Sequence, residues 1–293
     1  MRNRIIEIAE SPARLRIEHR QLVIDAGGTE SLPPARVPLD ELAVLVVAHP
    51  QVSYTQAVLT ELVSAGGTFV TCDRSRLPVG LLLPLDAHSI QTDRFRRQLD
   101  LPRPRQKRLW QQIVQAKIAM QARLLRDRFA DDAGLSRLVT AVRSGDPANV
   151  EGRAARRYWQ RLFGQDFRRD RHAEDHNRLL NYGYAILRAA VARAVAAAGL
   201  HPSLGVHHHN RNNSYCLADD LMEPYRPVVD RAVADIVDEF DDVPPLDQMT
   251  RAHLLGALTR AVLIEGEQRS LFDAIALSAS SLANVITEAA SRL

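Results

Sequence analysis

The sequence predicts an α+β protein in which a small β-rich N-terminal domain, a β-sheet with one packed helix, precedes a larger all-α domain. Over residues 1–85, short β-like apolar runs alternate with glycine and proline turns. Residues 86–92 follow neither pattern and are expected to form a linker. Over residues 93–293, apolar residues recur at the three- and four-residue spacing of buried helix faces.

In the N-terminal domain the pattern predicts strands, one helix and a further strand. The expected strands are residues 5–8, 15–18, 22–24, 42–47 and 68–72. The run 42–47 is continuously apolar and rich in valine, which is typical of a strand buried on both faces. Helical spacing over residues 55–64 ends at Gly66-Gly67.

The second domain begins with a long helix that starts near Arg105. One side of this helix carries Trp110, Ile113, Val114, Lys117, Ile118 and Gln121. A second apolar stripe runs from Leu180 to Val195 and ends before Gly199 and Pro202. Three further helices are expected over 228–240, 253–264 and 271–293.

Composition indicates a soluble protein, for which the cytoplasm is the default location. The sequence has no run of about 18 apolar residues that would suggest a membrane span. The first residues lack the apolar stretch of a signal peptide. Cys72 and Cys216 are too far apart in sequence to suggest a disulfide framework or a short-spaced metal motif.

The basic residues are nearly all arginine, and lysine occurs only at Lys107 and Lys117. The net charge is +3 and the pI is about 9.1. Arginine forms bidentate contacts with phosphate, which favours a nucleic-acid partner. A genome rich in G and C would produce the same bias without any such partner.

Residues 145–159 carry the first chemical signal. Asp146-Pro147 is expected to be the N-cap and first position of a helix, with Glu151 about one turn in. Glu151 is either a metal ligand or a first-turn glutamate favoured by the helix dipole. Arginines that could hold phosphates follow at positions 153, 156, 157, 161, 168, 169 and 171. The aromatic residues Tyr158, Trp159, Tyr182 and Tyr184 could stack on a base or pack in the core.

Residues 204–227 carry the second signal, three consecutive histidines at 207–209 followed by acidic residues at 219, 220 and 223. Asp220 and Glu223 share a face of a helical turn. Taken alone, the histidines could form a solvated loop and the aspartates could cap a helix. Together with Glu151, a histidine and Glu223 would form an inward-facing site for Mg²⁺ or Mn²⁺, as helical bundles build. Such a site suits phosphoryl transfer.

The segments 145–159, 179–210 and 217–230 resemble the CRISPR-associated integrase of spacer acquisition, in its type II form. Residues 40–54 and 75–89 also resemble this family, whereas the chain after about Leu246 does so least. The resemblance implies a metal-dependent catalytic domain over 93–293 with Glu151, His208 and Glu223 as catalytic metal ligands. His207 is the alternative to His208, because the third histidine, His209, shifts the match by one.

The resemblance further implies DNA integration in antiviral defence, in which the 3′-hydroxyl of a short DNA fragment attacks a phosphodiester at the edge of a CRISPR repeat. It implies a homodimer built through the N-terminal domains and a small ferredoxin-like CRISPR-associated partner that bridges two dimers. The type II form adds a ring-forming DNA-binding protein and an RNA-guided effector nuclease. Two alternatives are a general metal-dependent DNA nuclease and a non-catalytic DNA-binding scaffold subunit.

Overall fold

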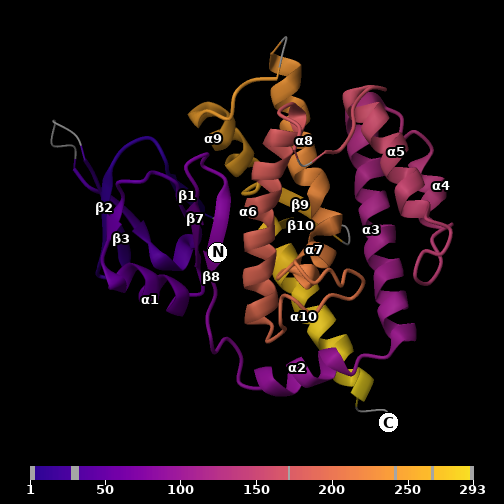
Figure 1. Cartoon of the computed structure of the whole chain (residues 1–293), viewed down its shortest axis with the longest axis horizontal. Helices are drawn as coiled ribbons and strands as arrows, with labels where there is room; N and C mark the ends of the chain where they lie inside the picture. Colours follow the sequence, from indigo (N-terminus) through magenta and orange to yellow (C-terminus); the bar gives the residue numbers. More distant parts are fainter. Residues whose placement is uncertain (1–3, 28–32, 171, 241–242, 265–266, 291–293) are drawn as a thin grey trace.

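The N-terminal domain contains two four-stranded sheets. The structure is a computed structural model that describes residues 4–27, 33–170, 172–240, 243–264 and 267–290. The first sheet has the order β1 (Arg4–Ile8), β5 (Leu42–Val47), β7 (Thr68–Cys72) and β8 (Pro78–Leu82). The second has the order β4 (Ala35–Pro38), β3 (Gln21–Ala26), β2 (Ala13–Glu18) and β6 (Ser53–Tyr54). Helix α1 (Gln56–Ser64) packs with β2 and β7 (Figure 1).

The sequence pattern predicts most of these strands but only one sheet. Strands β2, β3 and β4 pair antiparallel with their neighbours in sequence, whereas β1, β5 and β7 pair in parallel through long connections. Local periodicity identifies a strand, but it does not determine which distant strand it pairs with. The division into two sheets therefore corrects the prediction.

Strand β5 is buried on both faces, as predicted, and all six of its residues are buried. Val44 and Val46 belong to the core that the first sheet shares with the helical domain. Leu45 and Val47, on the opposite face, pack into the separate core of the N-terminal domain. Alternate residues of one strand thus hold the two domains together.

The C-terminal domain is mainly helical. Its helices are α2 (Gln91–Leu99), α3 (Arg103–Phe129), α4 (Leu135–Val139), α5 (Val150–Phe163), α6 (His176–Ala197), α7 (Cys216–Met222), the 3₁₀ turn η2 (Glu223–Tyr225), α8 (Arg226–Glu239), α9 (Gln248–Ala257) and α10 (Leu271–Ala290). Helix α6 packs against β5, β7 and β8 of the first sheet, and α3 packs against α5 and η2 farther from that sheet (Figure 1). Among the described residues, no helix has the length and apolarity needed to cross a bilayer.

Two details of the helical prediction are wrong. Strands β9 (Ala261–Ile264) and β10 (Glu267–Ser270) form an antiparallel hairpin where the sequence predicts the end of a helix over 253–264. A short apolar run that includes valine and isoleucine fits either a buried helix or a strand. Helix α2 begins at Gln91, so the expected linker over 86–92 is helical in its last two residues.

A buried arginine joins the two domains. Arg251 on α9 has no exposed side-chain surface, and its Nε lies 3.0 Å from a carboxylate oxygen of Glu7 on β1. The hydroxyl of Tyr182 on α6 donates a second hydrogen bond to Glu7, with an O···O distance of 2.8 Å. Because buried charges are stable only when paired, this cluster fixes how the first sheet sits on α6 and α9.

Candidate functional site

Glu151 lies in the first turn of α5, which begins at Val150 rather than near Pro147 as predicted. Asn149 is the N-cap, and its side chain accepts a hydrogen bond from the Gly152 N–H at 3.1 Å. The Asp146 carboxylate accepts bonds from the N–H groups of Val150 and Glu151, each at 2.9 Å. Two polar side chains therefore satisfy the free donors of this helix end and fix where Glu151 points.

Glu151 and Glu223 meet at one ammonium group. Lys117 on α3 places its Nζ 2.6 Å from Oε1 of Glu151 and 2.7 Å from Oε2 of Glu223. Arg226, on the first turn of α8, places its Nε 3.0 Å from the other carboxylate oxygen of Glu223. The structure thus brings two of the three predicted ligands together. Lys117 of α3 lies between the two carboxylates, and Arg226 of α8 lies beside Glu223.

The protonation states in this cluster follow from these pairs. Burial acts to raise the pKa of Glu223, but Arg226 and Lys117 outweigh it and hold the pKa at about 2. Burial likewise acts to lower the pKa of Lys117, and Glu223 and Glu151 outweigh it and raise the pKa. Glu223 is therefore a carboxylate and Lys117 an ammonium at neutral pH.

Of the three histidines, the structure distinguishes His208. Its Nδ1 lies 2.5 Å from Oδ1 of Asp220, a carboxylate with no exposed surface. The pKa of His208 is raised, first by this hydrogen bond and further by the charges of Asp220, Glu223 and Glu151. Because Nδ1 donates to Asp220, Nε2 is the nitrogen left with a lone pair in the neutral ring.

The neighbouring histidine has a packing role. The His207 ring stacks on the buried Trp110 ring, with centroids 4.0 Å apart and planes 4° from parallel. Asp220 also accepts hydrogen bonds from the N–H groups of Val206 and His207 at 2.7 and 2.8 Å. One buried carboxylate thus orders the histidine segment and orients the His208 ring, as carboxylates that accept a hydrogen bond from a metal-binding histidine do.

These residues fit a divalent cation by the chemistry of their donor atoms. Two carboxylates and an imidazole nitrogen form a mixed oxygen and nitrogen set that suits Mg²⁺ or Mn²⁺. Oε2 of Glu223 is buried and accepts no hydrogen bond of normal geometry, although Lys117 Nζ lies 2.7 Å from it. Among the described residues, no three His, Cys, Asp or Glu side chains stand close enough to hold a metal as they are placed here. A cation held by both glutamates would compete with the Lys117 ammonium, which contacts both carboxylates.

Sequence reasoning missed Lys117, Arg226 and the positioning role of Asp220. A signal for Lys117 was present, because it is one of only two lysines and falls within the buried stripe of α3. A lysine whose side chain is largely buried requires a charged partner, and that of Lys117 is only 13% exposed. No comparable signal marks Arg226 in a chain so rich in arginine.

A second polar cluster, formed by Asp230, Tyr158 and Tyr184, lies next to Arg226. The buried carboxylate of Asp230 accepts hydrogen bonds from the hydroxyls of Tyr158, at 2.7 Å, and Tyr184. Burial raises the pKa of Asp230 to about 6. The Arg226 guanidinium lies 4.6 Å from the centre of the Tyr184 ring. The buried tyrosines Tyr158, Tyr182 and Tyr184 are thus core residues, whereas Trp159 is only half-buried.

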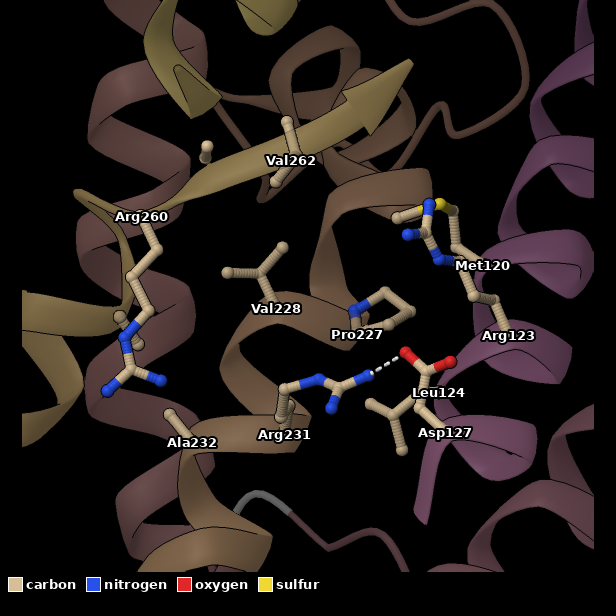
Figure 2. A pocket seen from close by; sticks show the side chains of 12 residues that line it. Met120, Arg123, Leu124, Asp127, Pro227, Val228, Arg231, Ala232, Arg260 and Val262 are labelled. Carbon is tan, nitrogen blue, oxygen red and sulfur yellow. Dashed lines mark hydrogen bonds and ion pairs between the residues drawn. The ribbon is translucent and has the colours of Figure 1, made fainter. Parts of the chain in front are cut away.

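A cavity of about 290 Å³ lies beside α3, but none of the predicted ligands lines it. Figure 2 shows that Arg123, Arg231 and Arg260 surround it, with Pro227 and Val228 between them and an ion pair from Arg231 to Asp127. Its lining residues come from α3, α8 and the segment from α9 to β9. The candidate site is therefore the cluster of charged side chains around Lys117, and it is distinct from the cavity shown in Figure 2.

The fold matches those of a casposase and of a Cas1 protein. A structure of a casposase bound to an integration product has the same fold, with a TM-score of 0.76 and 19% identity over 97% of this chain and 90% of that one. A Cas1 protein from Thermotoga maritima has a TM-score of 0.72 and 18% identity over 97% of both chains. At these identities the likeness establishes the fold.

Sequence comparison identifies the family. Residues 6–241 match the family described as CRISPR associated protein Cas1. The CRISPR-associated endonuclease Cas1 of Neisseria meningitidis serogroup C (strain 8013) is 36% identical over 285 residues, which cover 96% of this chain and 91% of that protein. The chain belongs to the Cas1 family. The family predicted from the motifs is confirmed, and its type II form stays a prediction.

Proposed function

We propose that this protein joins DNA strands at a divalent-metal site formed by Glu151, His208 and Glu223. The observation that carries the proposal is that α5 and η2 bring Glu151 and Glu223 to the same ammonium group of Lys117 on α3. Asp220 orients the His208 ring, and the charges of both glutamates help to raise its pKa. Mg²⁺ or Mn²⁺ bound there would stabilise the charge on a phosphate under attack and on the departing oxygen.

The proposed reaction is a transesterification. The 3′-hydroxyl of a short DNA fragment attacks a phosphodiester at the edge of a CRISPR repeat, so one phosphodiester forms as another breaks. No external energy source is needed. Glu151 and Glu223 approach the site from α5 and η2, and Asp220 holds His208 with Nε2 available to a ligand. The casposase structure with an integration product supports strand joining on this fold.

The proposed partners follow from the same family. A structure described as a Cas6-RT-Cas1--Cas2 complex has a TM-score of 0.73 and 20% identity over 98% of this chain and 35% of that chain. A TtCas1–DNA complex has a TM-score of 0.57 and 20% identity over 95% of this chain and 90% of that chain. These two complexes support DNA and a small CRISPR-associated protein as partners. Homodimerisation, the two type II partners and a cytoplasmic location belong to the same proposal.

The decisive experiment separates joining from cutting. The protein and its small partner are incubated with Mn²⁺, a labelled fragment with a 3′-hydroxyl, and supercoiled plasmid that carries a repeat. We expect the label to become covalently attached to the plasmid at the repeat edge. Nicked plasmid without attached label would favour a general nuclease, and an inert mixture would favour a DNA-binding scaffold.

Replacing Asp220 by asparagine is expected to weaken Mn²⁺ binding about 10–100-fold, because the residue that orients a ligating histidine tunes its affinity for metal. Isothermal titration of Mn²⁺ measures the effect. Asp219→Asn is the matched control, since Asp219 is also buried but pairs with Arg188 at 2.6 Å. Equal affinities for Asp220→Asn and wild type would remove Asp220 from this role.

A further inference from the structure

A buried carboxylate that the proposed reaction does not use joins three helices beside the candidate metal centre. Asp230 on α8 is only 1% exposed. Its Oδ2 accepts a hydrogen bond from the hydroxyl of Tyr158 on α5 at 2.7 Å, and its Oδ1 accepts one from the hydroxyl of Tyr184 on α6. Both tyrosines are buried. Because a buried charge is stable only with such partners, Asp230 fixes α5 and α6 against α8.

The Arg226 guanidinium is supported from outside its own ion pair. Its Nε lies 3.0 Å from Oε1 of Glu223, but this buried N–H makes no hydrogen bond of normal geometry to any described residue. The guanidinium lies 4.6 Å from the centre of the Tyr184 ring, which is within the range of a cation–π contact. The hydroxyl of that ring is bound by Asp230. A chain of contacts therefore runs from Asp230 through Tyr184 and Arg226 to Glu223.

The charge of Asp230 favours the same arrangement. Burial raises the pKa of Asp230 to about 6, whereas the two tyrosine hydroxyls and nearby cations act to lower it, so Asp230 is mainly a carboxylate at neutral pH. Burial acts to lower the pKa of Arg226, but negative groups that include Glu223 and Asp230 outweigh it and raise the pKa. Two carboxylates therefore stabilise the same guanidinium, one directly and one mainly through the tyrosine ring.

We propose that Asp230 is a positioning residue for strand joining, which fixes the Tyr184 ring so that Arg226 holds the Glu223 carboxylate in one orientation at the candidate metal centre. The inference rests on the proposed function, because it takes Glu223 as part of that centre. Asp230 acts through Tyr184 and Arg226 and not by contact with DNA or metal.

The first measurement uses EDTA and no DNA, so its outcome does not depend on strand joining. Urea unfolding of Tyr184→Phe, Glu223→Gln and the double variant gives the coupling between these two side chains. Tyr184→Phe is expected to raise the equilibrium constant for unfolding about threefold more in the wild-type background than in Glu223→Gln, where Arg226 has no carboxylate to hold. Because Tyr184→Phe changes no charge, direct electrostatic repulsion cannot produce this coupling.

The matched control is Tyr182→Phe. Tyr182 lies two residues from Tyr184 on α6, is also buried, and donates its hydroxyl to a carboxylate at 2.8 Å, but that carboxylate is Glu7 of β1. Its effect on unfolding is expected to be the same with and without Glu223→Gln. Equal effects of Tyr184→Phe in both backgrounds would overturn the inference, whether or not the protein joins DNA.

The second measurement is joining of a labelled fragment by the full protein with its small partner in Mn²⁺. Asp230→Asn and Tyr184→Phe are each expected to lower kcat about tenfold or more with KM for the fragment nearly unchanged, because a misplaced ligand slows the chemical step. Since both residues act along one path, the double variant should lose no more than Asp230→Asn alone. Tyr184→Phe decides the outcome if Asp230→Asn does not fold.

Three results of the joining assay would overturn the positioning role. They are wild-type kcat in folded Asp230→Asn, equal losses of kcat in Tyr182→Phe and Tyr184→Phe, and a loss confined to KM. An inert wild type would instead contradict the proposed function, and the unfolding measurements would then decide whether Tyr184 is coupled to Glu223.

Discussion

Replacing Lys117 by methionine is expected to tighten Mn²⁺ binding tenfold or more. The Lys117 ammonium lies within 2.7 Å of both Glu151 and Glu223, so a cation that binds both carboxylates has to break two ion pairs. After displacement its charge still repels the cation at short range, and a pair of unit charges about 4 Å apart is worth about 4 kcal/mol near a protein surface. The broken ion pairs and the remaining repulsion both weaken Mn²⁺ binding in the wild type, so removal of the ammonium should strengthen it. A tenfold change corresponds to about 1.4 kcal/mol, well within this range.

The measurement is a titration of Mn²⁺ into each variant, together with the melting temperature in EDTA and in Mn²⁺. Without metal, Lys117→Met is expected to melt below wild type, because two adjacent carboxylates lose a shared cation. Added Mn²⁺ should then raise its melting temperature more than that of wild type. Lys107→Met is the control, since Lys107 is exposed on the same helix. Unchanged or weaker Mn²⁺ affinity in Lys117→Met would show that Lys117 does not compete with the metal.

The fold was predictable where a local pattern determines the structure. The valine-rich run of β5 indicated a strand buried on both faces, and the apolar stripes of α3 and α6 indicated their helices. The division of the strands into two sheets depends on pairing between distant segments, which local periodicity does not encode. The β9–β10 hairpin depends on a short apolar run that fits two kinds of structure.

The sequence motifs selected candidate ligands but not the contacts that support them. Glu151 and Glu223 were selected from their motifs, and the structure places both against Lys117. The sequence could not single out one of the three histidines. The feature that distinguishes His208 is its hydrogen bond to Asp220, and the sequence pattern does not show that contact. The start of α5 was misplaced because Asp146 and Asn149 both bind free N–H groups of that helix end. Competing caps of this kind are distinguished only by backbone conformation.

Replacing Glu151 by glutamine is expected to reduce strand joining about a thousandfold or more while the protein stays folded. The substitution keeps the size of the side chain and removes the charge that would hold a divalent cation. Stabilisation by a metal contributes several kcal/mol to such a transition state, and about 1.4 kcal/mol corresponds to a factor of ten in rate. Glu151 is the cleaner choice than Glu223, because its side chain is 25% exposed and pairs with a single cation. Glu223 is more deeply buried between Lys117 and Arg226, so its loss would also destabilise the fold.

Single-turnover joining of a labelled fragment measures the effect, with circular dichroism as the check on folding. Glu174→Gln is the control, because Glu174 is a strongly exposed carboxylate paired only at the surface with Arg178. A further readout separates loss of metal from other causes: Mn²⁺ should raise the melting temperature of Glu174→Gln as it does that of wild type, and raise that of Glu151→Gln much less. Normal joining by Glu151→Gln would exclude Glu151 as a ligand. Lost joining with an unchanged Mn²⁺ response would instead assign Glu151 to contact with the DNA, because the metal would then be held without it.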